Sequence, residues 1–315
     1  MADEPVSSLG GKTPLEYAHT PALDKLARIG RCGSLQTVPD GFYPGSEVAI
    51  LTILGYEPSS LPAGRGPLEA SGLGIPIPEG YTAMRYLTDA GDFNIKELRS
   101  RFKDCTFIPI AATKGICIAP SNDVATLAKL SDIAFWSGDS YRTYPPLTSI
   151  HHTEDGTPLK TVIIGAVPLL HGIAIEIGAD WIKPEHATGT IHTDFKGKGE
   201  AAVRALDDYD LVIVHVEACD FASHARDVNG KINSIESIDK HIISPLLEIV
   251  TTTESDLAIA VMSDHPSLCE SGCHSSGNSP FVYFRQGIDG DNLKRFSEKS
   301  VRNGSLASIS DIYKL

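Results

Sequence analysis

Two apolar runs constrain the fold of this chain more than any other feature, because acids and histidines follow each of them. The run LVIV is followed by Asp220 and His224, and the run LAIAVM leads into Asp264 and His265. Continuous apolar runs of this length are typical of strands that helices cover on both faces. The pattern therefore predicts an α/β fold in which polar side chains gather where strands end.

Helical and strand-like patterns alternate along the rest of the chain. Helix-like patterns occur at residues 21–31, 47–54, 94–102, 197–209 and 232–250. Strand-like patterns occur at residues 105–111, 115–119, 160–164, 210–216, 256–264 and 279–285. This alternation predicts a mostly parallel sheet flanked by helices. A Gly/Pro-rich stretch at 62–80 marks a boundary, so we expect a core of residues 1–75 plus 141–315 and a smaller inserted α+β domain over 76–140.

Charge and composition exclude several classes of partner. The net charge of −13 argues against nucleic acid or an anionic membrane, although a small anionic substrate remains compatible with a local metal or arginine. No apolar run approaches the roughly 20 residues that cross a bilayer, and the N-terminus has no signal-peptide pattern. Six unevenly spaced cysteines in 315 residues predict free thiols in a cytoplasmic protein rather than a disulfide scaffold.

A cluster of carboxylates and histidines is the strongest chemical signal. Asp220 and His224 stand four residues apart, which places both side chains on one face of a helical turn. Asp264 and His265 end the second apolar run, and His274 follows nearby. Ligand sites in open α/β sheets lie at the carboxyl ends of strands, so these five residues are candidate metal ligands. Taken alone, Asp220 is equally compatible with a solvated helix cap.

Three other features each allow a functional and a structural interpretation. Ser46 stands before an apolar helix, where it is either an N-cap or a hydroxyl placed beside a bound phosphate. Arg65, in the glycine-rich segment GRGPLEA, is either a phosphate-binding fork or a solvated loop residue. Cys269 and Cys273 could complete a zinc site with neighbouring histidines, but their spacing matches no common zinc motif and favours ordinary loop cysteines.

The combined order of several segments identifies a family. The segments are MADEPVSSLGGKTPLEYAHTPALDKLARIGRCG, PGSEVAILTILGYEP, GRGPLEASGLGI, HATGTIHTDFKGKGEAAVRAL, LVIVHVEACDFASHARD and AIAVMSDHPS. Over most of residues 1–80 and 160–285, the chain resembles the archaeal-type cofactor-independent phosphoglycerate mutases of the alkaline phosphatase superfamily. Many bacterial relatives carry the label proposed homoserine kinase. The resemblance implies an alkaline phosphatase-like core.

The resemblance also implies a reaction and roles for particular residues. It implies 2,3-bisphosphoglycerate-independent interconversion of 3-phosphoglycerate and 2-phosphoglycerate through a phosphoserine, with two divalent ions. Manganese is the expected metal, and zinc, cobalt or magnesium are alternatives. Ser46 is the implied nucleophile and also a metal ligand. The implied substrate-binding residues are Arg65, Arg142 and His171, and the other implied metal ligands are Asp220, His224, His274, Asp264 and His265.

The chain departs from the family pattern in three places. The family begins with an apolar strand that ends in Asp-Gly directly before the MADEP segment, so we expect that strand and its metal-binding aspartate to be missing from this record. The inserted domain is shorter than usual. His171 stands where relatives tend to carry lysine or arginine. These departures keep two alternatives open: a phosphatase or phosphotransferase for another small phosphate ester, and an inactive metabolite-binding relative. The sequence does not indicate an oligomeric state.

Overall fold

The chain divides into two compact units. The computed structural model describes residues 1–57, 64–88, 95–111, 114–123, 127, 133–137, 159–253 and 256–308. The first unit contains Met1–Pro58, Lys160–Ala166 and Ile182–Leu315, and the second contains Ser59–Leu159 and Val167–Trp181. The predicted insertion at 76–140 lies inside the second unit, and its role as a cap stays a prediction. Each unit is described separately below.

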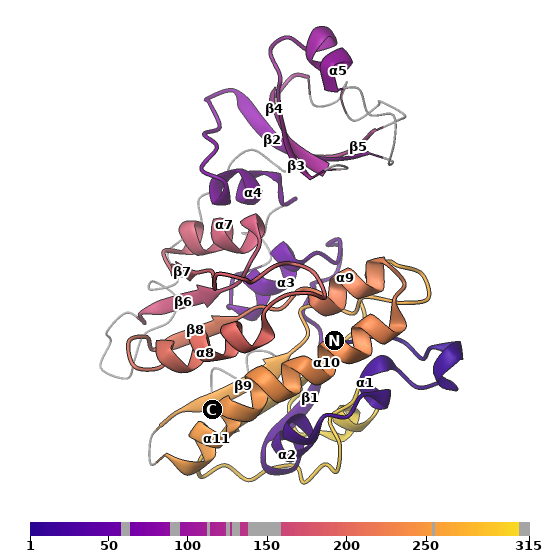
Figure 1. Ribbon diagram of the computed structural model, residues 1–315, viewed down its shortest axis with the longest axis vertical. Helices are drawn as coiled ribbons and strands as arrows, with labels where there is room; N and C mark the ends of the chain where they lie inside the picture. The colour runs from indigo at the N-terminus through magenta and orange to yellow at the C-terminus, as the bar shows by residue number, and fades with distance from the viewer. Residues whose placement is uncertain are drawn as a thin grey trace. The chain divides into compact units, whose positions relative to one another are not determined.

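The first unit combines two three-stranded sheets with helices (Figure 1). One sheet has the order β1-β10-β9, formed by Arg31–Leu35, Ser279–Arg285 and Ala258–Met262. The other has the order β7-β6-β8, formed by Asp180–Ile182, Thr161–Ile164 and Leu211–Val214. Its helices are η1 Ser7–Leu9, α1 Pro14–Tyr17, α2 Pro21–Ile29, α3 Ser46–Ile53, α8 Phe195–Ala205, α9 Ala218–His224, α10 Val228–Ile238, η4 Asp239–Ile243, α11 Ser244–Thr252 and η5 Ser300–Asn303. The predicted α/β class is confirmed.

The strand directions differ in part from the predicted mostly parallel sheet. Strands β6 and β8 run parallel, as the alternating pattern predicts. Strand β10 instead runs antiparallel to both β1 and β9. The chain between β9 and β10 contains no crossover helix, so it returns antiparallel. Strand β8 is less buried than predicted, because it ends its sheet among the described strands and its four apolar residues stay half buried.

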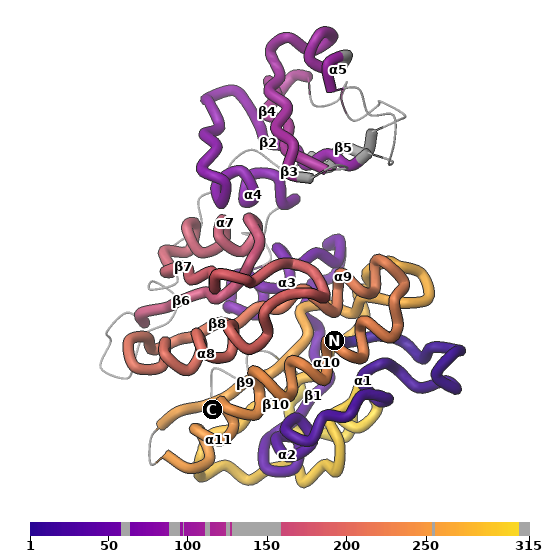
Figure 2. The backbone as a smooth tube through the Cα atoms, in the orientation of Figure 1, coloured from indigo at the N-terminus to yellow at the C-terminus, as the bar shows by residue number. Residues whose placement is uncertain are grey.

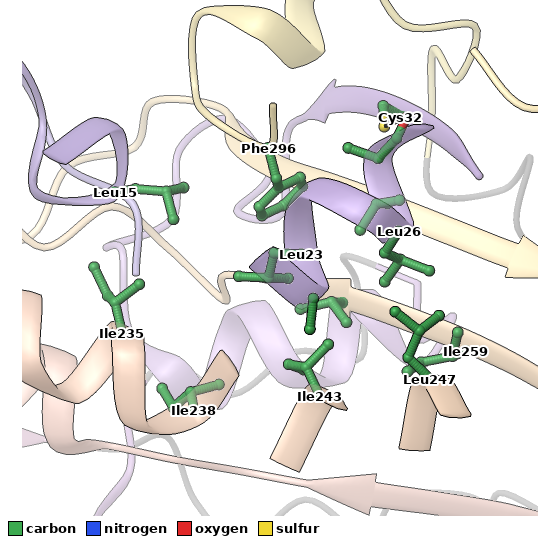
Figure 3. Close-up of a cluster of buried hydrophobic side chains, with 14 of the residues drawn as sticks. Leu15, Leu23, Leu26, Cys32, Ile235, Ile238, Ile243, Leu247, Ile259 and Phe296 are labelled. Atoms are coloured by element: carbon green, nitrogen blue, oxygen red, sulfur yellow. Dashed lines mark hydrogen bonds between the residues drawn. The ribbon is translucent and has the colours of Figure 1, made fainter. Parts of the chain in front are cut away.

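The main core lies between helices α2, α10, η4 and α11 and strands β1, β9 and β10. Figure 3 shows the side chains that fill it, which are Leu15, Leu23, Leu26, Cys32, Ile235, Ile238, Ile243, Leu247, Ile259 and Phe296. The amphipathic pattern predicted for α2 is confirmed, since its apolar side faces this core. Its first turn is capped from another element, because the Asp239 carboxylate accepts hydrogen bonds from the amides of Ala22 (3.1 Å) and Leu23 (2.7 Å).

The long helix predicted over 232–250 is interrupted. The structure places the π-helical turn η4 between α10 and α11. Pro245 has no amide hydrogen, and its ring crowds the carbonyl one turn earlier, so a wider turn before it relieves the conflict. Among the described helices, none combines the length and the apolar character needed to cross a bilayer.

The second unit is an α+β arrangement. Its antiparallel sheet has the order β3-β4-β2-β5, formed by Thr106–Ala111, Lys114–Pro120, Tyr81–Thr88 and Ile133–Ser137. Its helices include α4 Gly66–Gly72, α5 Ile95–Arg101 and α7 Pro168–Ile177. Helices α4 and α7 cross closely because glycines meet there: a Cβ on Gly172 would lie 1.8 Å from the Leu68 carbonyl oxygen, and a Cβ on Gly72 would lie 2.0 Å from that of Pro168.

Candidate metal centre

Three segments of the first unit bring the predicted ligands together. Helix α9 begins a few residues after β8, with Asp220 in its first turn and His224 in its last (Figure 1). Asp264 and His265 follow β9 directly. His274 lies on the return from β9 to β10, where it forms an isolated antiparallel bridge with Ser267.

Asp220, His224 and His274 form one tight group. Asp220 Oδ2 lies 3.3 Å from His224 Nε2, and Asp220 Oδ1 lies 3.0 Å from His274 Nε2. The two Nε2 atoms lie 3.0 Å apart. The Nδ1 atoms of the two histidines face backbone carbonyls, of Gly272 at 2.8 Å for His224 and of Pro44 at 2.6 Å for His274.

This geometry fits a divalent cation. A carbonyl only accepts hydrogen bonds, so each Nδ1 carries a proton and each neutral imidazole presents a lone pair at Nε2. Two lone pairs and a carboxylate that converge within about 3 Å repel one another unless a proton or a cation lies among them. Imidazole and carboxylate are also the ligands that transition-metal ions prefer.

Ser46 and His265 form the adjacent part of the site. Ser46 is the first residue of α3, and its Oγ lies 3.2 Å from His265 Nε2. The same Nε2 lies 3.3 Å from Asp264 Oδ2. His265 also belongs to the first group, because its ligand atom and those of Asp220 and His274 all lie within 4.8 Å of one another. The structure therefore places Ser46, Asp264 and His265 beside the group formed by Asp220, His224 and His274.

Burial and ionic contacts hold these groups in the forms that bind cations. Burial alone would raise the pKa of Asp220, but hydrogen bonds with His224 and His274 outweigh it and keep that pKa well below its ordinary range. Burial opposes ionisation of Asp264 as well, and the pull of His265 and His215 again lowers its pKa. Burial lowers the pKa of His265 despite the attraction of Asp264, which favours the neutral ligand form.

Two residues of the centre were missed by the sequence analysis. His215 directly follows β8, and its Nε2 lies 3.9 Å from Asp264 Oδ2. Ser267 donates its hydroxyl to Asp220 Oδ1 at 2.6 Å, and its oxygen lies 3.3 Å from His265 Nδ1. The position of His215 at a strand end could have identified it, because the same rule selected Asp264. No local pattern distinguishes Ser267 from other loop serines.

The predicted substrate-binding residues lie elsewhere in the chain. Arg65 precedes α4 in the second unit, and Arg142 lies outside the described residues. His171, in the first turns of α7, stacks on Trp181 with ring centroids 5.3 Å apart and planes inclined by 17°. Its Nδ1 donates to the Gly72 carbonyl at 2.7 Å. Their roles in binding substrate stay predictions.

The alternative zinc site with two cysteines finds no geometric support. Cys269 is buried, and its sulfur contacts the Ser223 hydroxyl at 3.8 Å. Cys273 is exposed. Among the described residues, the group of convergent donor atoms consists of Asp220, His265 and His274 and includes neither cysteine.

Known proteins share the sequence and the fold over nearly the whole chain. The family model of the metalloenzyme superfamily matches residues 1–313. A 2,3-bisphosphoglycerate-independent phosphoglycerate mutase of Methanosarcina acetivorans is 31% identical, with 98% of this chain and 94% of the relative covered. Phosphoglycerate mutase 2 of the same type from Methanothermobacter thermautotrophicus is 32% identical, with 98% and 92% covered.

Solved structures agree with this relationship. The PH0037 protein of Pyrococcus horikoshii superposes with a TM-score of 0.80 at 26% identity, covering 100% of this chain and 93% of that one. The cofactor-independent phosphoglycerate mutase of Thermoplasma acidophilum has a TM-score of 0.63 at 20% identity, covering 99% and 95%, and shares the fold. The chain therefore belongs to the metalloenzyme superfamily and, within it, to the family of archaeal-type cofactor-independent phosphoglycerate mutases.

Proposed function

We propose that this protein interconverts 3-phosphoglycerate and 2-phosphoglycerate through a phosphoserine at Ser46, independently of 2,3-bisphosphoglycerate. The observation that carries the proposal is the 3.2 Å approach of Ser46 Oγ to His265 Nε2 at the edge of a cluster of carboxylates and imidazoles. A hydroxyl in this position faces atoms that bind divalent cations, which is the arrangement expected for metal-assisted phosphoryl transfer. Relatives with the mutase name support the choice of substrate.

Two ligand groups would hold the divalent ions. Asp220, His224 and His274 would hold one ion, and Asp264 and His265 would hold the other together with Ser46. We propose manganese for both sites, with zinc, cobalt or magnesium as alternatives. Bound divalent ions supply charge that stabilises phosphoryl oxygens and lowers the pKa of a neighbouring hydroxyl.

The residues of the chain then perform the transfer in two halves. Ser46 Oγ, having lost its proton, attacks the phosphorus, and the bond from phosphorus to the glycerate oxygen breaks with its electron pair on that oxygen. The glycerate reorients while Ser46 holds the phosphoryl group. The other glycerate hydroxyl then attacks phosphorus, loses its proton, and frees Ser46. The buried side chain of His265 keeps one wall of the site dry, which favours transfer over hydrolysis.

Further parts of the proposal concern the substrate and the cell. We propose that Arg65, Arg142 and His171 contact the phosphoglycerate, and that an inserted domain over 76–140 closes over the site during turnover. We propose a cytoplasmic enzyme of glycolysis that binds neither nucleic acid nor membrane, in keeping with a net charge of −13.

His171 favours a second candidate, which keeps Ser46 and the metals but uses another phosphate ester. Its ring stacks on Trp181 and its Nδ1 is engaged by Gly72, so it offers a substrate less than a free lysine or arginine would. A panel of small phosphate esters separates the two candidates: the mutase proposal expects turnover of phosphoglycerate and no comparable release of phosphate from the other esters.

An enolase-coupled assay with Mn²⁺ tests the proposed reaction directly. The wild-type protein is expected to convert 3-phosphoglycerate, and Ser46→Ala is expected to abolish turnover while it still binds Mn²⁺. Ser237→Ala is the control, because that hydroxyl is on the exposed side of α10 and bonds only its own helix, at Asn233. The proposal is wrong if the metal-loaded wild type shows no mutase activity, or if Ser46→Ala retains it.

A further inference from the structure

A fully buried lysine lies behind the metal centre. Lys231, on α10, has no exposed surface, and each proton of its ammonium group has an acceptor. Its Nζ donates to the Ala2 carbonyl at 3.0 Å, to Asp3 Oδ2 at 2.8 Å and to the Ser267 carbonyl at 2.6 Å. Figure 2 shows the N-terminal segment that supplies two of these acceptors lying beside α10. A buried ammonium with three short contacts fixes all three acceptors in place.

The residues around Lys231 fasten both ends of the segment that carries two predicted ligands. The Ala2 amide donates to Ser263 Oγ at 2.9 Å, and the Ala2 carbonyl accepts from the Ser267 amide at 3.2 Å. Asp264 and His265 lie between these two serines. Just beyond the segment, the Asp3 carboxylate accepts from the Cys269 amide at 3.2 Å.

Ser267 extends this support to the other ligand group. Its hydroxyl donates to Asp220 Oδ1 at 2.6 Å, and its oxygen lies 3.3 Å from His265 Nδ1. A shift of the Ser267 backbone would therefore disturb the orientation of a ligand in each group. We propose that Lys231 is a positioning residue of the metal centre, which it orients through Ser267 and the N-terminal residues. The proposal rests on the metal-dependent function above.

A purely structural ion pair between Lys231 and Asp3 is the competing explanation. Removal of one partner from a buried pair destabilises a protein strongly, whereas removal of both charges is often tolerated. Stability and metal affinity can therefore be separated. If Lys231 only stabilises the fold, a variant without either charge regains both stability and metal affinity. If Lys231 positions the ligands, that variant regains stability and still binds metal weakly.

The experiment compares Lys231→Met, the double variant Lys231→Met/Asp3→Asn and wild type. Lys240→Met is the matched control, because Lys240 is exposed in the adjacent η4 turn. Circular dichroism gives the folded state and the melting temperature, and titration followed by the electron paramagnetic resonance of free Mn²⁺ gives the Kd. We expect the double variant to melt near the wild-type temperature while its Mn²⁺ Kd rises by about 10–100-fold, the usual effect of losing support behind a ligand.

Each other outcome overturns the proposal. A double variant with a Kd within about threefold of wild type would show that Lys231 does not act on the ligands. Unfolding of both variants would leave Lys231 as a structural residue alone, and wild-type protein that binds no Mn²⁺ would remove the premise. Wild type that binds Mn²⁺ without converting phosphoglycerate would refute the mutase function instead, while the ratio of Kd values still decides the role of Lys231.

Discussion

Replacement of Ser267 by alanine tests whether its hydroxyl supports the metal centre. The hydroxyl donates a 2.6 Å hydrogen bond to Asp220 Oδ1, and its oxygen lies 3.3 Å from His265 Nδ1. The backbone contacts of this residue with Ala2 and Lys231 do not involve the side chain, so Ser267→Ala removes the support of the ligands alone.

The expected magnitude follows from the charge of the acceptor. A hydrogen bond to a charged group contributes about 1.5–3 kcal/mol. Since about 1.4 kcal/mol corresponds to a tenfold change in Kd, the loss predicts roughly 10–150-fold weaker binding. Measured losses behind metal ligands fall at about 10–100-fold, which agrees. We therefore predict that Ser267→Ala raises the Mn²⁺ Kd by about one to two orders of magnitude.

Isothermal titration of EDTA-stripped protein with Mn²⁺ measures this change. Ser234→Ala is the matched control, because Ser234 is equally buried on α10 but its hydroxyl bonds only the carbonyl of Gly230 in its own helix. The control is expected to bind Mn²⁺ as wild type does. If Ser267→Ala binds with wild-type affinity, the hydroxyl does not orient Asp220, and the reasoning from the hydrogen-bond geometry is refuted.

Three further predictions concern stability. Gly172→Ala should destabilise the second unit by about 3 kcal/mol or more, because its Cβ would lie 1.8 Å from the Leu68 carbonyl oxygen; an unchanged melting temperature would contradict the close crossing of α4 and α7. Asp239→Ala should cost about 3 kcal/mol, since two buried amides at the start of α2 lose their acceptor, and urea unfolding with an unchanged midpoint would exclude this cap. Mn²⁺ at a hundredfold excess over its Kd should raise the free energy of unfolding by about 2.7 kcal/mol, and EDTA should reverse the gain; no thermal shift would argue against binding to the folded state.

Local pattern predicted much of the fold and part of the candidate site. The 3.6-residue period predicted α2, and the apolar runs predicted β8 and β9. The rule that strand ends collect functional groups brought Asp220 and Asp264 into one site before any coordinates were considered. These features depend on neighbours in sequence, so they are readable from one chain.

Features that depend on distant contacts were not readable from the pattern. Ser46 and His265 are separated by 219 positions, and only the family resemblance linked them before the structure showed the contact. Ser267 and Lys231 act through hydrogen bonds that leave no periodic signal. The antiparallel direction of β10 was missed because the pattern of apolar residues does not record which way a strand runs.

Anomalous X-ray diffraction from Mn²⁺-soaked crystals is the most direct test of the metal centre. The account predicts strong manganese peaks within bonding distance of Asp220, His224 and His274 and of Asp264 and His265, with the Ser46 hydroxyl beside the second peak. Manganese density at other places only, or clear absence of density at these five side chains in metal-saturated crystals, would contradict it.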